Sequence, residues 1–440
     1  MRIKKTTACN LLLCLLSLPV MAQVKPADYV NPIIGTNGMG HTFPGACVPH
    51  GIVQLSPDTD TIPHNVNGVY QPRAYEYCAG YQYKDSTIVG FSHTHLSGTG
   101  HSDLGDILIM PFTGPLQTNP GTASDPDSGY RSRFSHNTEV ARPGYYEVML
   151  SDDAIKVQLT TTERVGIHKY TYPRGASQKI IVDLNHAIYN YDGKVLWANL
   201  RVENDTLLTG YRITNGWSRV NYTYFAISFS KSIKKYGYED KQKVAYNGFW
   251  RRFKVNENFP EIGGRKVVSY FEFDDSDNKP LEIKVALSGV STLGALKNLE
   301  AEASGRTFDE LTIQAAEKWN KELSVIEAHG DKDKLTMLYT SLYHTLINPS
   351  VYADVDGQYR GVDQAVHQTK DFMNYTVFSV WDTYRALHPL FNIINRERNT
   401  DMVKSMIAHS QQSVHKALPV WSHMGNENWC MIGYHSVSVL

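Results

Sequence analysis

The sequence has no excess of either charge. Its 440 residues include 43 Lys+Arg and 44 Asp+Glu, which gives a formal net charge of −1. Binding to nucleic acid depends largely on Lys and Arg that neutralise phosphates, and the basic residues here occur at most in pairs such as Lys234-Lys235. The composition therefore gives no electrostatic reason to expect a nucleic-acid partner.

Cysteine is scarce. The chain has five, and Cys9 and Cys14 lie within the first 22 residues. The remaining three, Cys47, Cys78 and Cys430, are too few for a disulfide framework, and nothing in the spacing supports a Cys47–Cys78 bridge. The fold must therefore rely on its hydrophobic core. An apolar content of 42% is enough to build one over this length.

Long apolar runs are absent after the first 22 residues. Residues 1–22 read MRIKKTTACNLLLCLLSLPVMA, in which basic residues precede an apolar run and a small-residue cleavage site ends at Ala22. This pattern predicts a secretory signal peptide. No later run reaches the roughly 18 apolar residues that span a bilayer. We therefore expect an exported protein, periplasmic or secreted in a bacterium, without integral membrane association. A lipid anchor on Cys14 is less favoured, because Leu13 precedes it instead of a small residue.

Tyrosine is abundant by contrast. The chain has 27 Tyr, 7 Trp and 15 Phe. Tyrosine presents an apolar ring and a polar hydroxyl, which suits partly wetted surfaces. Packing on strand faces and a ligand-binding surface both account for the excess, and composition does not decide between them.

Residues 23–290 are predicted to form an antiparallel β-sandwich. Alternating runs rich in Val, Ile, Thr, Tyr and Phe are separated mostly by Gly, Asn, Asp or Pro. Residues 31–115 are crowded with Gly, Pro, His and Asn, so we expect ordered loops and short strands over a surface there. The predicted strands are residues 145–150, 155–162, 165–170, 179–184, 222–229, 267–273 and 281–288.

Helical periodicity begins after residue 290. Thr307 and Glu310 form a capping-box pattern, and apolar residues then recur at helical spacing through Leu323. Residues 291–330 are therefore a predicted helical linker, and residues 331–440 a predicted helical domain. Its expected helices have apolar faces at Leu335, Leu338, Tyr339, Leu342 and Leu346, then at Met402, Val403, Met406 and Ile407, and in a last helix from Asn428 at Ile432 and Val439. The chain stops at Leu440 in an apolar segment without a stop signal, so we expect a longer helical domain that is truncated here.

Two motif groups lie in the predicted β region. NPIIGT (31–36), HTFPGA (41–46) and VPHG (48–51) combine Gly and Pro into rigid loops. FSHTHLSGTGHSDLGD (91–106) would place His93 and His95 on one strand face. His101, Asp103 and Asp106 could join them as Zn or Fe ligands. A polar ligand-binding loop is the favoured interpretation, and a hydrogen-bonded structural role is the other alternative.

Two further motifs place a carboxylate beside tryptophan. They are VWDTYR (380–385), with Trp381 and Asp382, and GNENWCMIGYHS (425–436), with Glu427 and Trp429. A carboxylate accepts hydrogen bonds from sugar hydroxyls while an indole covers an apolar ring face. Helix capping by Asp382 and Asn426 is an equally good explanation of these positions.

Taken together, the motifs resemble glycoside hydrolase family 92, the calcium-dependent, inverting exo-α-mannosidases. The resemblance runs from Tyr29 to Leu440. It implies an N-terminal β-sandwich, a helical linker and an (α/α)6 barrel, of which this chain holds only the start. It also implies a Ca²⁺ cofactor and a mannose-containing glycan substrate. In such enzymes a Glu acid and an Asp base act from opposite sides of the scissile bond.

The resemblance assigns substrate contacts but no catalyst. Asp382 matches the aspartate that contacts the terminal mannose, and Trp381 lines that pocket. The family's acid, base and calcium ligands would lie beyond Leu440, so no catalytic residue and no metal ligand is predicted here. The other predicted substrate-binding residues are His93, His95, Ser97, Glu427 and Trp429.

Three functions follow, in order of preference. The first is an exported exo-α-mannosidase that removes terminal α-linked mannose, most often α-1,2, from N-glycans or mannans. The second is a truncated, non-catalytic fragment with at most weak glycan binding. The third is a metallohydrolase centred on His93, His95, His101 and Asp103. The sequence leaves the oligomeric state open.

Overall fold

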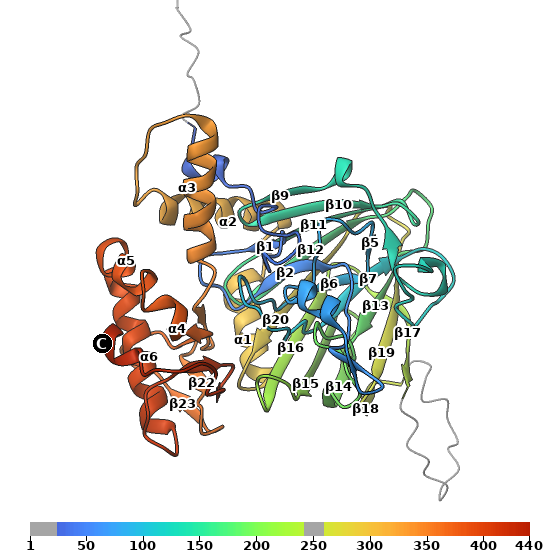
Figure 1. The fold of residues 1–440 in the computed structure, drawn as a ribbon. Helices are drawn as coiled ribbons and strands as arrows, with labels where there is room; N and C mark the ends of the chain where they lie inside the picture. The colour runs from blue at the N-terminus through green and yellow to red at the C-terminus, as the bar shows by residue number, and fades with distance from the viewer. Residues whose placement is uncertain (1–23, 242–258) are drawn as a thin grey trace, which may run out of the picture.

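The computed structural model describes residues 24–241 and 259–440. The predicted signal peptide, residues 1–22, lies outside the described residues. Figure 1 shows a β-rich part and, beside it, a largely helical part that ends the chain. In the part of the chain that is described, no helix has the length and apolar character to cross a membrane.

Two antiparallel sheets form the β-rich part. The first sheet has seven strands, in the order β1 (Ala46–Cys47), β2 (Gln54–Asp58), β6 (Gly90–Ser92), β7 (Leu108–Phe112), β13 (Lys179–Asp183), β19 (Val267–Phe273) and β17 (Ile233–Asp240). The second has nine, in the order β18 (Glu261–Gly264), β14 (Val195–Asn204), β15 (Leu207–Thr214), β16 (Asn221–Phe229), β20 (Leu281–Ser288), β12 (Val165–Thr171), β11 (Ile155–Thr161), β10 (Tyr145–Leu150) and β9 (Val140–Arg142).

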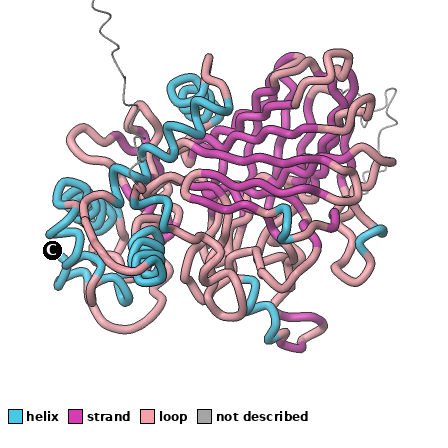
Figure 2. Tube along the Cα trace, turned by 90° about the horizontal axis from the view of Figure 1, so that it is seen from above, coloured by secondary structure: helices cyan, strands magenta, loops and turns pink. Residues whose placement is uncertain are grey.

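The main core lies between these sheets. Inward residues of β11 and β12, such as Leu159 and Tyr170, are fully buried in one cluster with residues of both sheets. Outward residues of the nine-stranded sheet, such as Ile167 and Ala226, instead pack under helix α1 (Thr292–Ala303). Successive residues along a strand point to opposite faces of the sheet, so both faces of this sheet are buried against other parts of the protein. Figure 2 shows the strands gathered on one side and most of the helices on the other.

The predicted strands are confirmed to within one residue at either end. The sequence prediction missed β14, β15 and β17. It was also wrong to place residues 31–115 over a surface, since β2, β6 and β7 are wholly buried strands of the seven-stranded sheet. Pro57 pairs with Phe91, and Pro111 with Ile180. Proline cannot donate to a ladder, which is why these runs do not resemble sheet strands in sequence.

The remaining helices make up the C-terminal part. They are α2 (Phe308–Leu323), α3 (Lys332–Thr345), α4 (Val380–Thr383), α5 (Leu387–Ile394), α6 (Arg396–Gln412) and α7 (Ser436–Val439). The predicted capping box at Thr307 is confirmed. The predicted helix from Asn428 is wrong, because residues 428–435 are irregular and Ile432 is 82% exposed. Asn426 caps no helix either, since it lies in a short strand.

The remaining strands form small sheets of two or three strands. They are β3 (Asn65–Val66) with β4 (Val69–Tyr70), β5 (Thr87–Ile88) with β8 (Ser132–Arg133), β21 (Ser350–Val351) with β24 (Tyr375–Thr376), β22 (Gln358–Arg360) with β23 (Val366–Gln368), and β25 (Phe378–Ser379) with β26 (Trp421–His423) and β27 (Asn426–Glu427).

The N-terminal segment packs on the helical part. Phe43 and Cys47 belong to the same buried cluster as Trp319 and Tyr343. The Trp319 indole N–H donates to the Cys47 carbonyl at 2.6 Å, and the Cys47 Sγ lies 3.4 Å from the Tyr343 hydroxyl. Cys47, Cys78 and Cys430 are all free thiols, so the Cys47–Cys78 bridge does not form.

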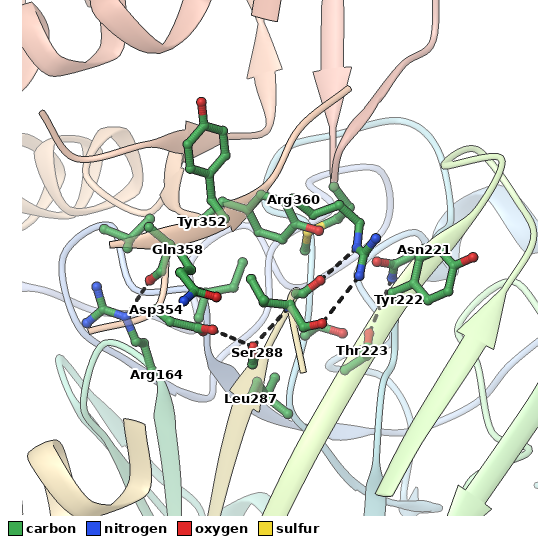
Figure 3. A pocket seen from close by; sticks show the side chains of 18 residues that line it. Arg164, Asn221, Tyr222, Thr223, Leu287, Ser288, Tyr352, Asp354, Gln358 and Arg360 are labelled. Carbon is green, nitrogen blue, oxygen red and sulfur yellow. Dashed lines mark hydrogen bonds between the residues drawn. The ribbon is translucent and has the colours of Figure 1, made fainter. Parts of the chain in front are cut away.

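A second contact joins the two parts around a small cavity of about 30 Å³ (Figure 3). The Ser288 hydroxyl, at the end of β20, donates to Asp354 at 2.7 Å. The Arg360 Nε–H donates to the Gly289 carbonyl at 2.8 Å. Asp354 and Arg360 of the helical part thus hydrogen-bond to the hydroxyl and carbonyl groups at the end of β20. These charge-assisted contacts attach the helical part to the sandwich.

Candidate functional site

A cavity of about 400 Å³ lies between the two parts. Its sandwich wall is the loop of residues 97–101 with Tyr75 and Trp217. Its helical wall comes from the end of α3, the Asn348-Pro349 turn, and α4. Residues from distant parts of the chain therefore converge here. The polar and aromatic residues that line the cavity include Tyr75, Ser97, Thr99, His101, Trp217, His344, Thr345, Asn348, Ser379, Asp382, Thr383 and Trp421.

Asp382 supplies the carboxylate of this cavity, and among the described lining residues it is the only Asp or Glu. It lies in the single turn of α4, where Val380 is buried and Asp382 is exposed. The Ser379 hydroxyl donates to its Oδ2, which fixes the rotamer. The remaining oxygen is free to accept hydrogen bonds from a hydroxylated ligand. Trp381 does not line the cavity, and the Arg385 guanidinium lies 4.9 Å from its ring centroid.

Aromatic rings form another part of the lining. Trp217 and Trp421 lie 4.1 Å apart between centroids, and His101 stacks on Trp217 at 4.5 Å. Sequence reasoning missed Trp217 and Trp421, because it searched for tryptophan next to a carboxylate and neither has one as a neighbour in the chain. Their signal is a tryptophan in a loop or short strand beside glycine or histidine, which is too common to select them.

A buried ion pair holds this wall in place. Asp103 accepts from the Lys194 ammonium and, at 3.1 Å, from the Ser218 backbone N–H. Its Oδ2 also lies 3.3 Å from the His423 Nε2 in β26 of the helical part. Burial would raise the pKa of the Asp103 carboxyl, but Lys194 and His423 outweigh burial and hold it well below its ordinary value. Asp103 is therefore ionised, and it ties the loop that carries His101 to the helical part.

His93 and His95 do not reach the cavity. Both are fully buried. The His93 Nδ1 bonds to the Ile107 carbonyl at 2.6 Å, and the His95 Nε2 lies 2.9 Å from Asp58. The prediction that they touch substrate therefore needs correction: the tight turns after β6 point both rings into the sandwich. Ser97, from the same motif, does line the cavity.

Glu427 and Trp429 also lie outside the cavity lining. Glu427 accepts from the backbone N–H groups of Val420, Trp421 and Trp429 at 3.1, 2.8 and 3.0 Å. Burial raises the pKa of Glu427 despite these bonds. Its role in the structure is to hold the strand that carries Trp421. Trp429 is 40% exposed and contacts His415 edge-on at 5.6 Å.

The histidine and aspartate residues of the 91–106 motif do not form a metal site. Asp103, His95 and Asp106 each have a different protein partner, and Asp106 lies 3.0 Å from Arg212. The described residues contain no group of three or more His, Cys, Asp or Glu placed to hold an ion. Calcium prefers six to eight oxygen ligands, and a cavity with one carboxylate does not fit it.

Comparison with known proteins decides the family. Residues 29–288 match the glycosyl hydrolase family 92 N-terminal domain, and residues 294–440 match the family 92 catalytic domain. The chain belongs to glycoside hydrolase family 92. The resemblance seen in the motifs is thereby confirmed.

Solved structures of the family agree with this. The chain is 42% identical to the family 92 α-mannosidase BT3965 from Bacteroides thetaiotaomicron, solved in complex with mannoimidazole, with a TM-score of 0.86 over 94% of this chain and 52% of that one. It is 27% identical to the inverting mannosidase BT2199 from the same organism, with a TM-score of 0.78 over 95% and 52%. An uncharacterized secreted glycosidase from Arthroderma benhamiae is 25% identical over 81% of this chain and 45% of that protein. The chain thus spans about half the length of these family members.

Proposed function

We propose that this chain is part of an exported, inverting exo-α-mannosidase that removes terminal α-linked mannose, most often α-1,2, from N-glycans or mannans, and that its calcium is bound by ligands outside the described cavity. The observation that carries the proposal is the cavity in which Asp382 faces the Ser97 loop and an aromatic wall. It is large enough to admit a terminal sugar residue, as an exo-acting enzyme requires. The names of the two Bacteroides relatives supply mannose as the sugar.

Each wall of the cavity would bind a different part of a sugar. Asp382 would accept hydrogen bonds from adjacent hydroxyls, and a charged acceptor strengthens each of them. Trp217 and Trp421 would cover the apolar C–H groups. Ser97 would add a donor from the sandwich loop.

The domains we propose are a β-sandwich at residues 23–290, a helical linker at 291–330 and the first part of an (α/α)6 barrel at 331–440. The predicted leader and the secreted relative support export.

The replacement Asp382→Asn tests the site. It keeps the shape of the side chain but removes the charge, so we expect kcat/KM of the intact gene product for mannose release from α-1,2-mannobiose to fall by about 10- to 100-fold. Release should also stop with a chelator, and the α-1,3 and α-1,6 isomers should react more slowly. Asp309→Asn is the control, because Asp309 is an exposed carboxylate on α2. Equal rates in the two variants, or release indifferent to chelation, contradict the proposal.

A second candidate is glycan binding without hydrolysis. Inversion needs two carboxyl groups about 6.5–9.5 Å apart, and the described cavity lining holds only Asp382. On this alternative the chain binds mannoimidazole and releases no mannose from any mannobiose. Isothermal titration and a rate measurement on the 440-residue chain itself, compared with the rate of the intact gene product, separate the two candidates. Metal analysis of this preparation tests the third hypothesis, a metallohydrolase centred on the 91–106 motif. No metal-binding cluster among the described residues favours that hypothesis.

A further inference from the structure

A second hollow lies on the sandwich, away from the cavity. Its volume is about 480 Å³, and it runs between the β3–β4 hairpin and the loop of residues 185–193. An adjoining hollow of about 560 Å³ shares Pro63, Asn185, Asn190 and Lys266 with it. We call the two together the sandwich groove. Two adjoining hollows of this size can hold a ligand longer than one sugar residue.

The groove offers hydrogen-bonding groups that the protein itself leaves unused. In the described structure, the side-chain amides of Asn67, Asn185 and Asn190 make no hydrogen bond. Each amide carries donors and an acceptor side by side, which matches the paired donor and acceptor character of neighbouring sugar hydroxyls. Tyr191 adds an aromatic ring to the same lining.

The charge of the lining is nearly balanced. Asp192 pairs with Lys266 at 2.8 Å, so Arg265 provides the one net charge of the first hollow. In the second hollow Arg131 pairs with Asp60 at 3.3 Å, and the charges of Lys241 and Asp183 offset each other. A strongly anionic ligand would need more cations than this. The lining therefore favours a neutral, hydroxyl-rich ligand, and an oligosaccharide has that chemistry.

A series of ring contacts connects the groove with the cavity. Tyr191 lies 4.9 Å from Tyr189, Tyr189 lies 5.9 Å from His101, and His101 stacks on Trp217 at 4.5 Å. His101 and Trp217 line the cavity. One sugar chain can therefore extend from the cavity to the groove along partly exposed rings.

We propose that the sandwich groove binds the inner sugar units of a neutral oligosaccharide whose terminal residue enters the cavity. The proposal rests on the proposed function for the identity of that terminal residue. It adds that the sandwich contacts substrate well beyond the sugar that is cleaved. Affinity should therefore increase with the length of the oligosaccharide.

The test compares a long and a short probe on the full chain, by isothermal titration with α-linked mannotetraose and with methyl α-mannoside. The double variant Asn185→Ala/Asn190→Ala removes two neutral hydrogen-bonding groups, so we expect about tenfold weaker binding of the tetraose. Binding of methyl α-mannoside should not change. Tyr191→Ala should show the same pattern. Asn137→Ala, an exposed asparagine outside the groove, is the matched control.

The outcomes separate this proposal from the proposed function. One outcome is that methyl α-mannoside does not bind, while the tetraose binds the unmodified chain and binds the groove variants more weakly. This outcome supports the groove proposal and contradicts the proposal that the cavity binds mannose. Asp382→Ala should abolish binding of methyl α-mannoside and leave measurable binding of the tetraose. The groove proposal is overturned if the groove variants bind the tetraose as the control does, if they weaken both probes equally, or if neither probe binds the unmodified chain. Thermal melting of each variant verifies that the fold is intact.

Discussion

Replacing Asp103 with alanine is expected to lower the free energy of unfolding by about 3–5 kcal/mol. The substitution leaves the Lys194 ammonium, whose side chain is 2% exposed, without its counter-charge. It also removes the acceptor of the Ser218 N–H and the partner of His423. Breaking one side of a buried pair costs much more than breaking a surface pair, because the other charge stays buried. Urea-induced unfolding followed by far-ultraviolet circular dichroism measures the change.

The control for this experiment is Asp371→Ala. Asp371 also pairs with a lysine, Lys404, but the side chains are 79% and 39% exposed. Water can replace the lost partner there, so little change in stability is expected. A second readout is tryptophan fluorescence, since Asp103 fixes the wall that contains Trp217 and Trp421. Asp103→Ala should shift the emission to the red below the unfolding transition. Equal and small losses of stability in both variants contradict the account of the buried pair.

The network around Asp103 also shows why the sequence did not predict the site. Its partners Lys194, Ser218 and His423 are 91, 115 and 320 residues away in the chain. No local pattern reports contacts of that range. The motif itself suggested a metal-ligand set. Histidine and aspartate at short spacing occur both in metal sites and in buried ion-pair networks, so the spacing does not tell the two apart. Only the packing of the two parts separates the alternatives.

Elements set by local chemistry were predicted well. The alternation in β10 to β12 survives because one face of each strand meets the core, and the capping box at Thr307 is satisfied within three residues. The Asp382 position came from the family motif, and its place in the cavity depends on the short α4 turn. The helix predicted from Asn428 does not form. Its apolar residues are not buried, and Glu427 accepts from the Trp429 backbone N–H in an irregular turn where the helix would begin.

Lowering the pH from 7 to 5.5 is expected to lower the free energy of unfolding by about 4 kcal/mol, owing to three buried histidines. Burial lowers the pKa of His50 to about 3 and the pKa values of His93 and His409 to about 4. In the unfolded chain each has its ordinary value of about 6.5. The unfolded state therefore binds more protons between pH 6.5 and 4. Stability is fully present above pH 6.5 and falls as the pH decreases through this window. Urea unfolding at half-unit steps of pH measures the slope.

A variant of one histidine tests whether these groups cause the slope. His409 lies 3.2 Å from the Asn374 Oδ1 and 3.0 Å from the Ser422 hydroxyl. In His409→Gln the side chain no longer titrates, so the loss of stability between pH 7 and 5.5 should decrease by the share of one histidine, about 1 kcal/mol, whatever the change in absolute stability. His329→Asn is the control, because the His329 side chain is 88% exposed and is hydrated in both states. An unchanged slope in His409→Gln would exclude His409 as one of the groups responsible. A slope that decreases in both variants would instead indicate a general effect of net charge.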